Sequence, residues 1–231
     1  MLAAVAAGLA FVHTLAGPDH YVPVLAMARA RDWSARRTVA VTCACGAGHV
    51  ASSVALAAFA AFAVVGTERM LALESLRGEL AAWGLIAFGT VYAVWGIRRA
   101  LRNRPHVHWH VHDDGTVHEH RHDHHGGHLH PHESPARPSL TPWVLFTIFL
   151  LGPCEPLIPI LMVPAAAGDW LGFAAISALF GTVTVVTMLA AVFVALHGLR
   201  RIRIPALERW SSALAGASVA ACGFAIVVLG L

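Results

Sequence analysis

The chain has 231 residues, of which 57% are hydrophobic and 13% charged, and its formal net charge at pH 7 is +3. Its mean hydropathy of +0.65 lies far above the average of soluble domains. The composition therefore predicts an integral membrane protein. It disfavours a nucleic-acid-binding role, because the basic residues form no basic domain.

Six apolar windows follow one another along the chain, and each is long enough to cross about 30 Å of hydrocarbon as a helix. They cover residues 2–28, 38–65, 80–101, 141–166, 170–197 and 211–231. The windows are continuous rather than alternating, which favours helices over a β-barrel. No positive residue precedes the first window, so we interpret it as a membrane span and not as a signal peptide. We predict an all-α integral membrane protein with six transmembrane helices.

All 16 basic residues are arginines, and their distribution between the loops is uneven. Fourteen follow spans one, three and five, whereas only Arg69 and Arg77 fall in the loop between spans two and three. Positively charged loops tend to stay in the cytoplasm. The sequence thus predicts cytoplasmic loops after the odd-numbered spans, both termini outside, and a place in the cell inner (cytoplasmic) membrane.

An internal repeat relates the two halves of the chain, residues 1–101 and 141–231, which are joined by residues 102–140. Offsets of 134 to 135 residues match Gly17-Pro18 with Gly152-Pro153, Gly46 with Gly181, Gly89 with Gly223, and Gly96 with Gly230. Each half holds three spans, an odd number, so the second half must enter the membrane from the opposite side. The sequence therefore predicts an inverted repeat of the kind found in secondary transporters.

The matched segments GPDHYVP and GPCEPLIP place prolines inside apolar spans one and four. A proline lacks the N–H that a helix needs and clashes with the preceding turn. Unpaired backbone at membrane depth is tolerated only beside protein, water or a bound ion. We therefore expect helices one and four to be broken, and the two breaks to form one coordination site near the midplane.

The ionisable residues inside the spans near these breaks are His13, Asp19, His20, His49 and Glu155. Each costs about 2.5–3.5 kcal/mol at mid-helix, so we expect them to meet one another or a cation. Imidazole and carboxylate ligands together suit Ni²⁺, Co²⁺ and Zn²⁺. Cys154 and Thr184 are candidate additional ligands, since Thr184 occupies the repeat position of His49. Ordinary structural roles stay open for single residues, such as a threonine bonded to its own helix.

A histidine-rich loop between spans three and four, residues 106–132, holds 12 of the 16 histidines. They are His106, His108, His110, His112, His118, His120, His122, His124, His125, His128, His130 and His132. Such tracts bind divalent metals without fixed geometry, and we expect this one to be disordered when empty. A pH-sensing loop is the alternative, because histidines titrate near pH 6.5. A cytoplasmic metal-binding loop favours efflux slightly over uptake.

At HTLAGPDH, CGAGHVASS and the histidine-rich loop, the chain resembles the nickel/cobalt transporter superfamily. The resemblance is to its six-helix branch, which includes nickel/cobalt efflux proteins and UreH-type urease accessory membrane proteins. That family's metal signatures imply ligand roles for His13, Asp19, His20 and His49. His13 departs in spacing, since five residues separate it from Asp19 where the importers have four.

We therefore predict a secondary transporter, not an enzyme, that carries a divalent metal, Ni²⁺ or Co²⁺ before Zn²⁺, and has no resident cofactor. Glu155 is the candidate for proton coupling. The chain holds no nucleotide-binding motif, so an ion gradient or a partner subunit must supply the energy. The expected partners are the metal ion and the lipid bilayer; a homo-oligomer and a metallochaperone stay open.

Three other functions stay open. LGPCEPLIPIL is similar to the DsbD-type transmembrane thiol carriers, which need a matched cysteine in each half, but the partner of Cys154 here is Asp19. An organic-anion or sulfite exporter of the same architecture is disfavoured by the two carboxylates at the proposed site. The third is a scaffold that assists the maturation of a metalloenzyme.

Overall fold

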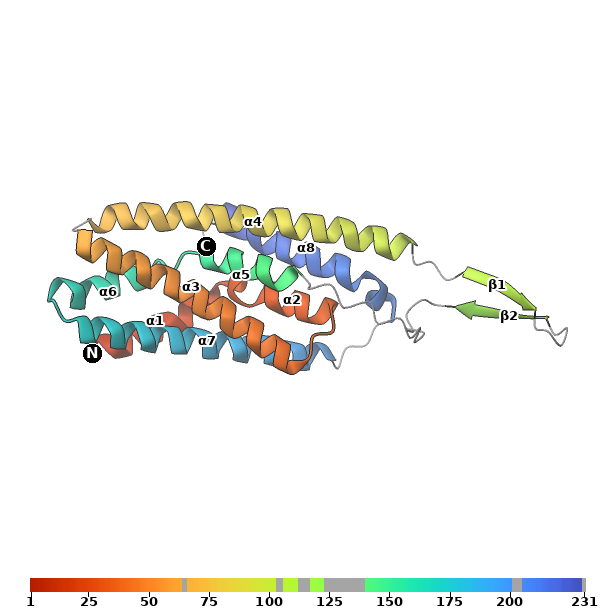
Figure 1. Cartoon of the computed structure of the whole chain (residues 1–231), viewed down its shortest axis with the longest axis horizontal. Coiled ribbons are helices and arrows are strands. Elements are labelled where there is room, and N and C mark those ends of the chain that lie inside the picture. Colours follow the sequence, from red (N-terminus) through yellow and green to blue (C-terminus); the bar gives the residue numbers. More distant parts are fainter. Residues whose placement is uncertain (64–65, 103–105, 112–116, 123–139, 201–204, 230–231) are drawn as a thin grey trace.

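The computed structural model describes residues 1–63, 66–102, 106–111, 117–122, 140–200 and 205–229 (Figure 1). Before the histidine-rich loop the elements are α1 (Leu2–Ala16), η1 (Pro18–His20), α2 (Val22–Ala30), α3 (Ala35–Ala63) and α4 (Thr67–Arg102). After it they are α5 (Thr141–Leu151), α6 (Leu157–Ala166), α7 (Trp170–Arg200) and α8 (Pro205–Leu229). The order of one broken helix and two long helices thus occurs twice.

Four helices, α3, α4, α7 and α8, are long and apolar enough to cross a membrane. The pair α1 and α2, bent by 83° at η1, adds a fifth candidate if it is counted as one span. Helices α5 and α6 are apolar, but each is shorter than the 18 residues expected of a membrane-spanning helix. The described residues therefore offer four or five candidate spans where the sequence predicts six, and the difference lies at the proline-rich break between α5 and α6.

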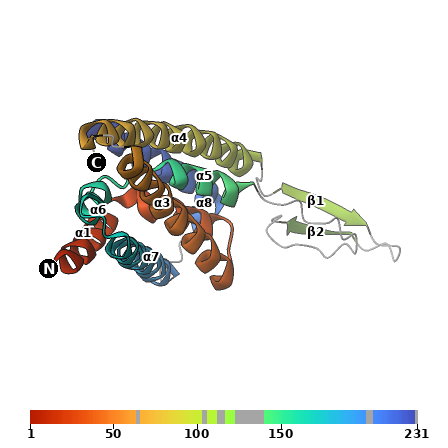
Figure 2. The ribbon, with the colours of Figure 1, turned by 60° about the vertical axis from the view of Figure 1, so that its left-hand side comes forward.

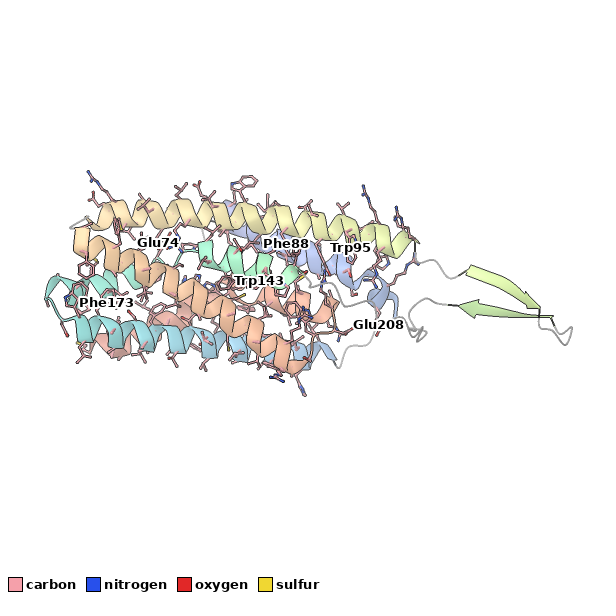
Figure 3. The ribbon with its side chains drawn as sticks, in the orientation of Figure 1. Glu74, Phe88, Trp95, Trp143, Phe173 and Glu208 are labelled. Carbon is pink, nitrogen blue, oxygen red and sulfur yellow. The ribbon has the colours of Figure 1, made fainter. Side chains whose placement is uncertain are left out.

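Large apolar side chains cover the outer faces of these helices (Figure 3). The exposed ones include Phe59, Phe62, Trp83, Val91, Trp143, Leu171, Val194 and Phe224. In the four long helices, only 28–39% of the apolar window is buried inside the protein. Apolar surface on this scale is costly in water. The helices accordingly fit a chain that is embedded in a membrane.

Both predicted breaks occur. Helix α1 ends at Ala16, and the extended backbone of the next residue, Gly17 (φ −86°, ψ 99°), turns the chain into η1. Helix α5 ends at Leu151, the next residue, Gly152, is also extended (φ −57°, ψ 137°), and Pro153 and Pro156 lie before α6 begins. Prolines cannot continue the hydrogen-bond ladder of a helix, so the chain leaves each helix at the matched Gly-Pro pair.

Glycines set the closest helix contacts. Helices α4 and α8 pack together more extensively than any other pair (Figure 2). A Cβ atom at Gly89 would meet the backbone of Ala220, and one at Gly223 would meet the backbone of Ala82. Helix α3 approaches α7 at Gly46, where a Cβ would lie 2.9 Å from the Met188 sulfur. Glycines that the repeat matches thus occupy helix crossings, where a side chain would push the helices apart.

A β-hairpin projects from the end of α4 (Figure 1). Strands β1 (His106–Val111) and β2 (Val117–His122) are antiparallel, with His106 opposite His122, His108 opposite His120 and His110 opposite His118. The composition of this stretch predicts disorder in the absence of metal, which differs from the two strands found here, but its alternation of histidine with other residues also has the period of a strand. His112, His124, His125, His128, His130 and His132 lie outside the described residues.

Candidate metal centre

Three histidines from separate elements meet beside the first break. His13 lies in the last turn of α1, His20 in η1, and His49 in the middle of α3. One ring nitrogen from each lies within 4.8 Å of the other two. The ring centroids of His13 and His20 are 4.7 Å apart, and those of His20 and His49 are 4.8 Å apart. The bend at η1 brings His20 back toward His13, which a straight helix would hold two turns away.

Two oxygens orient the ring of His20. Its Nδ1 lies 3.1 Å from the Gly17 carbonyl oxygen and 3.1 Å from Oδ1 of Asp19. Both oxygens accept hydrogen bonds, so Nδ1 carries the proton. Nε2 then presents its lone pair to the cluster. A carboxylate behind an imidazole in this manner is the usual support of a metal-binding histidine.

The second break orients His49. The ring of His49 lies beside the backbone of Phe149 and Gly152. A Cβ atom at Gly152 would lie 3.1 Å from Nδ1 of His49 and 3.2 Å from the Phe149 carbonyl oxygen. Nδ1 is therefore the His49 nitrogen on the side of the second break, and a side chain at residue 152 would press on it. Nε2 of His49 is the nitrogen that faces His20.

The Nε2 atoms of His20 and His49 lie 3.3 Å apart. Two lone pairs that face each other repel unless a proton or a cation lies between them. Two nitrogens bound to one tetrahedral ion at about 2.0–2.1 Å are separated by roughly 3.3–3.4 Å. Nε2 of His13 is buried and has no hydrogen-bond partner among the described residues. The cluster therefore has the donor set of a three-histidine metal centre, and its His20–His49 pair has the spacing of two ligands of one ion.

The remaining predicted ligands differ in their positions. Asp19 touches the cluster through His20, and Glu155 lines the same cavity as the histidines. The side chain of Cys154 is fully buried in an apolar cluster that includes Leu157 and Ile158. Thr184 is also buried, and its hydroxyl has no partner among the described residues. Neither Cys154 nor Thr184 lines the cavity.

The cavity that contains the three histidines has a volume of about 230 Å³. Its walls come from the two breaks and from the facing sides of α4 and α8. On the α4 wall lie Gly78, Ala81 and Leu85, and Ile226 comes from α8. A small, largely apolar chamber of this kind strengthens the attraction between a cation and the few polar groups that face it.

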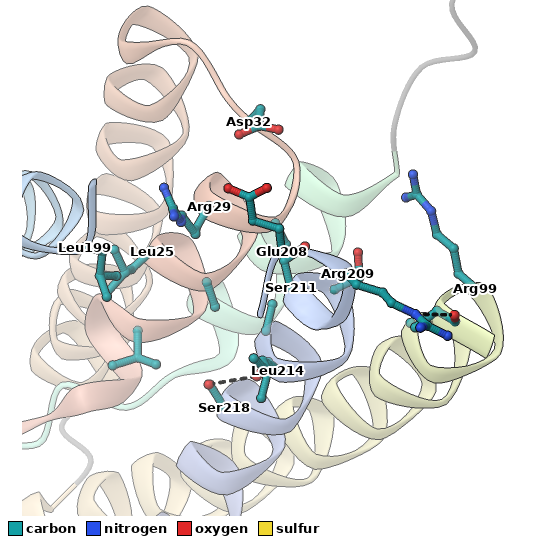
Figure 4. A pocket seen from close by; sticks show the side chains of 17 residues that line it. Leu25, Arg29, Asp32, Arg99, Leu199, Glu208, Arg209, Ser211, Leu214 and Ser218 are labelled. Atoms are coloured by element: carbon teal, nitrogen blue, oxygen red, sulfur yellow. Dashed lines mark hydrogen bonds between the residues drawn. The ribbon is translucent and has the colours of Figure 1, made fainter. Parts of the chain in front are cut away.

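A larger cavity of about 580 Å³ lies further along α2, α4 and α8 (Figure 4). Its charged lining residues are Arg29, Asp32, Arg99, Glu208 and Arg209. It contains no histidine, and three of its five charges are positive. The chemistry of the lining therefore assigns the metal centre to the smaller cavity.

Two charged residues near the site were not predicted to have a role there. The sequence analysis places Arg77 in a loop, but α4 begins at Thr67 and includes both Glu74 and Arg77. Glu74 is fully buried, and its Oε1 lies 2.5 Å from Nη1 of Arg77. The only signal in the sequence is the run of leucines from residue 71 to 80, which extends the helix past these charges.

Comparisons with protein-family models, with curated proteins and with solved structures give no match to this chain. The resemblance to the nickel/cobalt transporter superfamily thus rests on the sequence motifs alone.

Proposed function

We propose that the chain is a secondary transporter for a divalent transition-metal ion, Ni²⁺ or Co²⁺ in the first place and Zn²⁺ in the second. The observation that carries the proposal is the pair of Nε2 atoms of His20 and His49, oriented toward each other at 3.3 Å. The ring of His20 is held from behind by an oxygen acceptor, and the ring of His49 lies against the second break, so the pair is preorganised for a shared cation.

The residues of the site would have different roles in binding the ion. His13, His20 and His49 bind the ion through nitrogen, the donor that suits borderline divalent metals. Asp19 orients His20 and supplies a negative charge that offsets part of the charge of the ion. Glu155, on the wall of the same cavity, is the carboxylate that would complete the coordination or take up a proton.

Two features support a transport path through this centre. The histidine cavity is lined by residues up to His20 and the larger cavity by residues from Val22 onward, and both are also lined by α4 and α8. The contact of α1 with α7 is matched by a contact of α5 with α3. The first segment of each broken helix thus contacts a long helix of the other half. Such contacts are expected for six spans arranged as two inverted repeats, in which one half moves against the other around the site.

The excess of arginines near the end of α4 supports a cytoplasmic position for the larger cavity and for the histidine-rich loop. In that orientation both termini are outside. The loop would concentrate ions on the cytoplasmic side, which favours efflux over uptake. A thiol-carrier function has less support, because Cys154 is buried in the apolar cluster and does not reach the cavity.

The proposal is tested by the nickel, cobalt and zinc content of cells that make the intact protein, measured by mass spectrometry. His20→Ala is the test variant. His197→Ala, near the end of α7, is the matched control. Metal content that is lower in cells with the intact protein or with His197→Ala than in cells with His20→Ala indicates efflux. Metal content that is higher in those cells than in cells with His20→Ala indicates uptake. Equal content of all three metals in all strains would contradict the proposal.

A further inference from the structure

We propose that Glu74 and Arg77 are positioning residues of the metal centre, which fasten the second broken helix to α3 so that His49 keeps its orientation. The inference rests on the proposed function, because it assigns these residues a role at the same site. Neither residue lines the histidine cavity, so each would act through other groups.

Glu74 and Arg77 satisfy the free backbone groups of the second break. The N–H of Cys154, which leads into α6, donates to Oε2 of Glu74 at 3.0 Å. Nη2 of Arg77 donates to the Leu150 carbonyl at 2.8 Å and to the Gly152 carbonyl at 3.3 Å. A helix break in an apolar environment leaves such groups without partners. The acidic residue thus binds the free N–H and the basic residue binds the free carbonyls.

The same two residues hold α3 immediately after His49. Nη2 of Arg77 donates to the Ser52 hydroxyl at 2.5 Å, and that hydroxyl donates to the His49 carbonyl at 2.8 Å. Ser53 donates to Oε2 of Glu74 at 3.4 Å. Arg77 is therefore one hydrogen-bonded residue away from the backbone of His49.

The break in turn holds the His49 ring. Gly152, whose carbonyl Arg77 binds, lies beside Nδ1 of His49, since a Cβ atom at Gly152 would be 3.1 Å from that nitrogen. On α4, Gly78 lets the helix approach, since a Cβ there would lie 3.0 Å from Cγ of Pro153. The backbone and the ring of His49 are thus both tied to the Glu74–Arg77 pair, which fixes where Nε2 points.

The test is a cycle of variants in proteoliposomes that contain the full chain, with Co²⁺ flux as the readout. We expect Arg77→Gln to raise the KM for Co²⁺ by about 10-fold, as loss of an outer partner of a metal ligand does. In a Ser52→Ala background, which already lacks the link to the His49 backbone, the same change should raise KM by less than it does in the intact chain, because effects that act through one residue are not additive. An equal rise in both backgrounds would overturn the proposal.

Matched controls lie on the same helix. Arg69→Gln and Glu79→Gln remove exposed charges of α4 and should leave KM unchanged. The double variant Glu74→Arg/Arg77→Glu restores an ion pair but puts a cation beside the N–H and a carboxylate beside the carbonyls. We expect no rescue by this exchange, and full rescue would show that only the ion pair matters.

A second readout is independent of transport. Cys154 is fully buried, and its N–H is held by Glu74. In Arg77→Gln and Arg77→Lys, a small maleimide should label Cys154 faster than in the intact protein, as mapped by peptide mass spectrometry. Should Arg77→Gln not fold, Ser52→Ala removes only the link to His49 and should raise KM in the same direction. Unchanged labelling and unchanged KM would overturn the proposal. Absence of Co²⁺ flux with the intact protein would instead overturn the proposed function.

Discussion

The two helix breaks share a Gly-Pro pair but differ in what holds them. The first, around Pro18, is held by its own side chains, since Nδ1 of His20 lies 3.1 Å from both Asp19 and the Gly17 carbonyl. The second, around Pro153, is held from outside by two residues of α4. The difference indicates a division of labour. In the proposed site, the first break supplies ligands, and the second supplies a wall that keeps the ligand of a third helix in place.

The largest effect should come from the ligands of the first break. His20→Ala removes the nitrogen closest to His49 and the group that Asp19 orients. We expect metal flux to fall to the level of empty liposomes with normal expression of the protein. Flux that is reduced by less than half would show that the first break does not carry the essential ligand.

The glycines of the two breaks should be sensitive for the same reason. A Cβ at Gly17 would lie 2.5 Å from Nδ1 of His20 and 2.8 Å from Oδ1 of Asp19. A Cβ at Gly152 would press on His49. We expect Gly17→Ala and Gly152→Ala each to weaken Co²⁺ transport by about 10-fold or more. Gly8→Ala in α1, where nothing lies within 4 Å, is the control and should have no effect on the same KM measurement.

Two substitutions of Asp19 should show whether its carboxylate acts by orienting the His20 ring or through its negative charge. In Asp19→Asn the side chain keeps an oxygen that can accept from Nδ1 of His20, whereas Asp19→Ala has none. We expect a loss of metal affinity of about 10–100-fold for alanine and a smaller one for asparagine. Equal losses for both variants would indicate that the charge of Asp19, and not its hydrogen bond, is what the site needs.

The smallest effect should come from the histidine-rich loop. Replacement of its 12 histidines by serine should leave the maximal rate unchanged and reduce metal binding by the full chain. Because metal and protons compete for imidazole nitrogen, binding by the loop should be present at neutral pH and lost below about pH 6. Equilibrium dialysis with Ni²⁺ at two pH values measures this. A fall in the maximal rate would show that the loop belongs to the transport site.

The sequence was sufficient to find the breaks and the three histidines, because prolines and ionisable side chains are conspicuous in apolar spans. It was not sufficient to separate Glu155 from Cys154. They are neighbours, and only the path of the chain through the break turns one toward the cavity and the other into the core. Arg77 lies before the apolar window 80–101, so hydropathy places it in a loop although α4 begins at Thr67. Its contact with Gly152 joins residues that are far apart in the sequence, which no local pattern predicts.

The short lengths of α5 and α6 could not be predicted from hydropathy, which reports composition and does not report where a helix stops. The polar, low-complexity composition of the histidine-rich loop predicts disorder, whereas its two-residue alternation predicts strands. The hairpin follows the alternation. Both differences concern local backbone geometry. Neither moves the three histidines apart.

The most direct measurement is Co²⁺ flux into proteoliposomes that contain the purified full chain, followed with a metal-quenched dye trapped inside. The intact protein should carry Co²⁺ faster than protein-free liposomes do, His49→Ala should abolish the difference, and His197→Ala should retain it. Equal flux with the intact protein and with His49→Ala would contradict the assignment of the histidine cluster as the transport site.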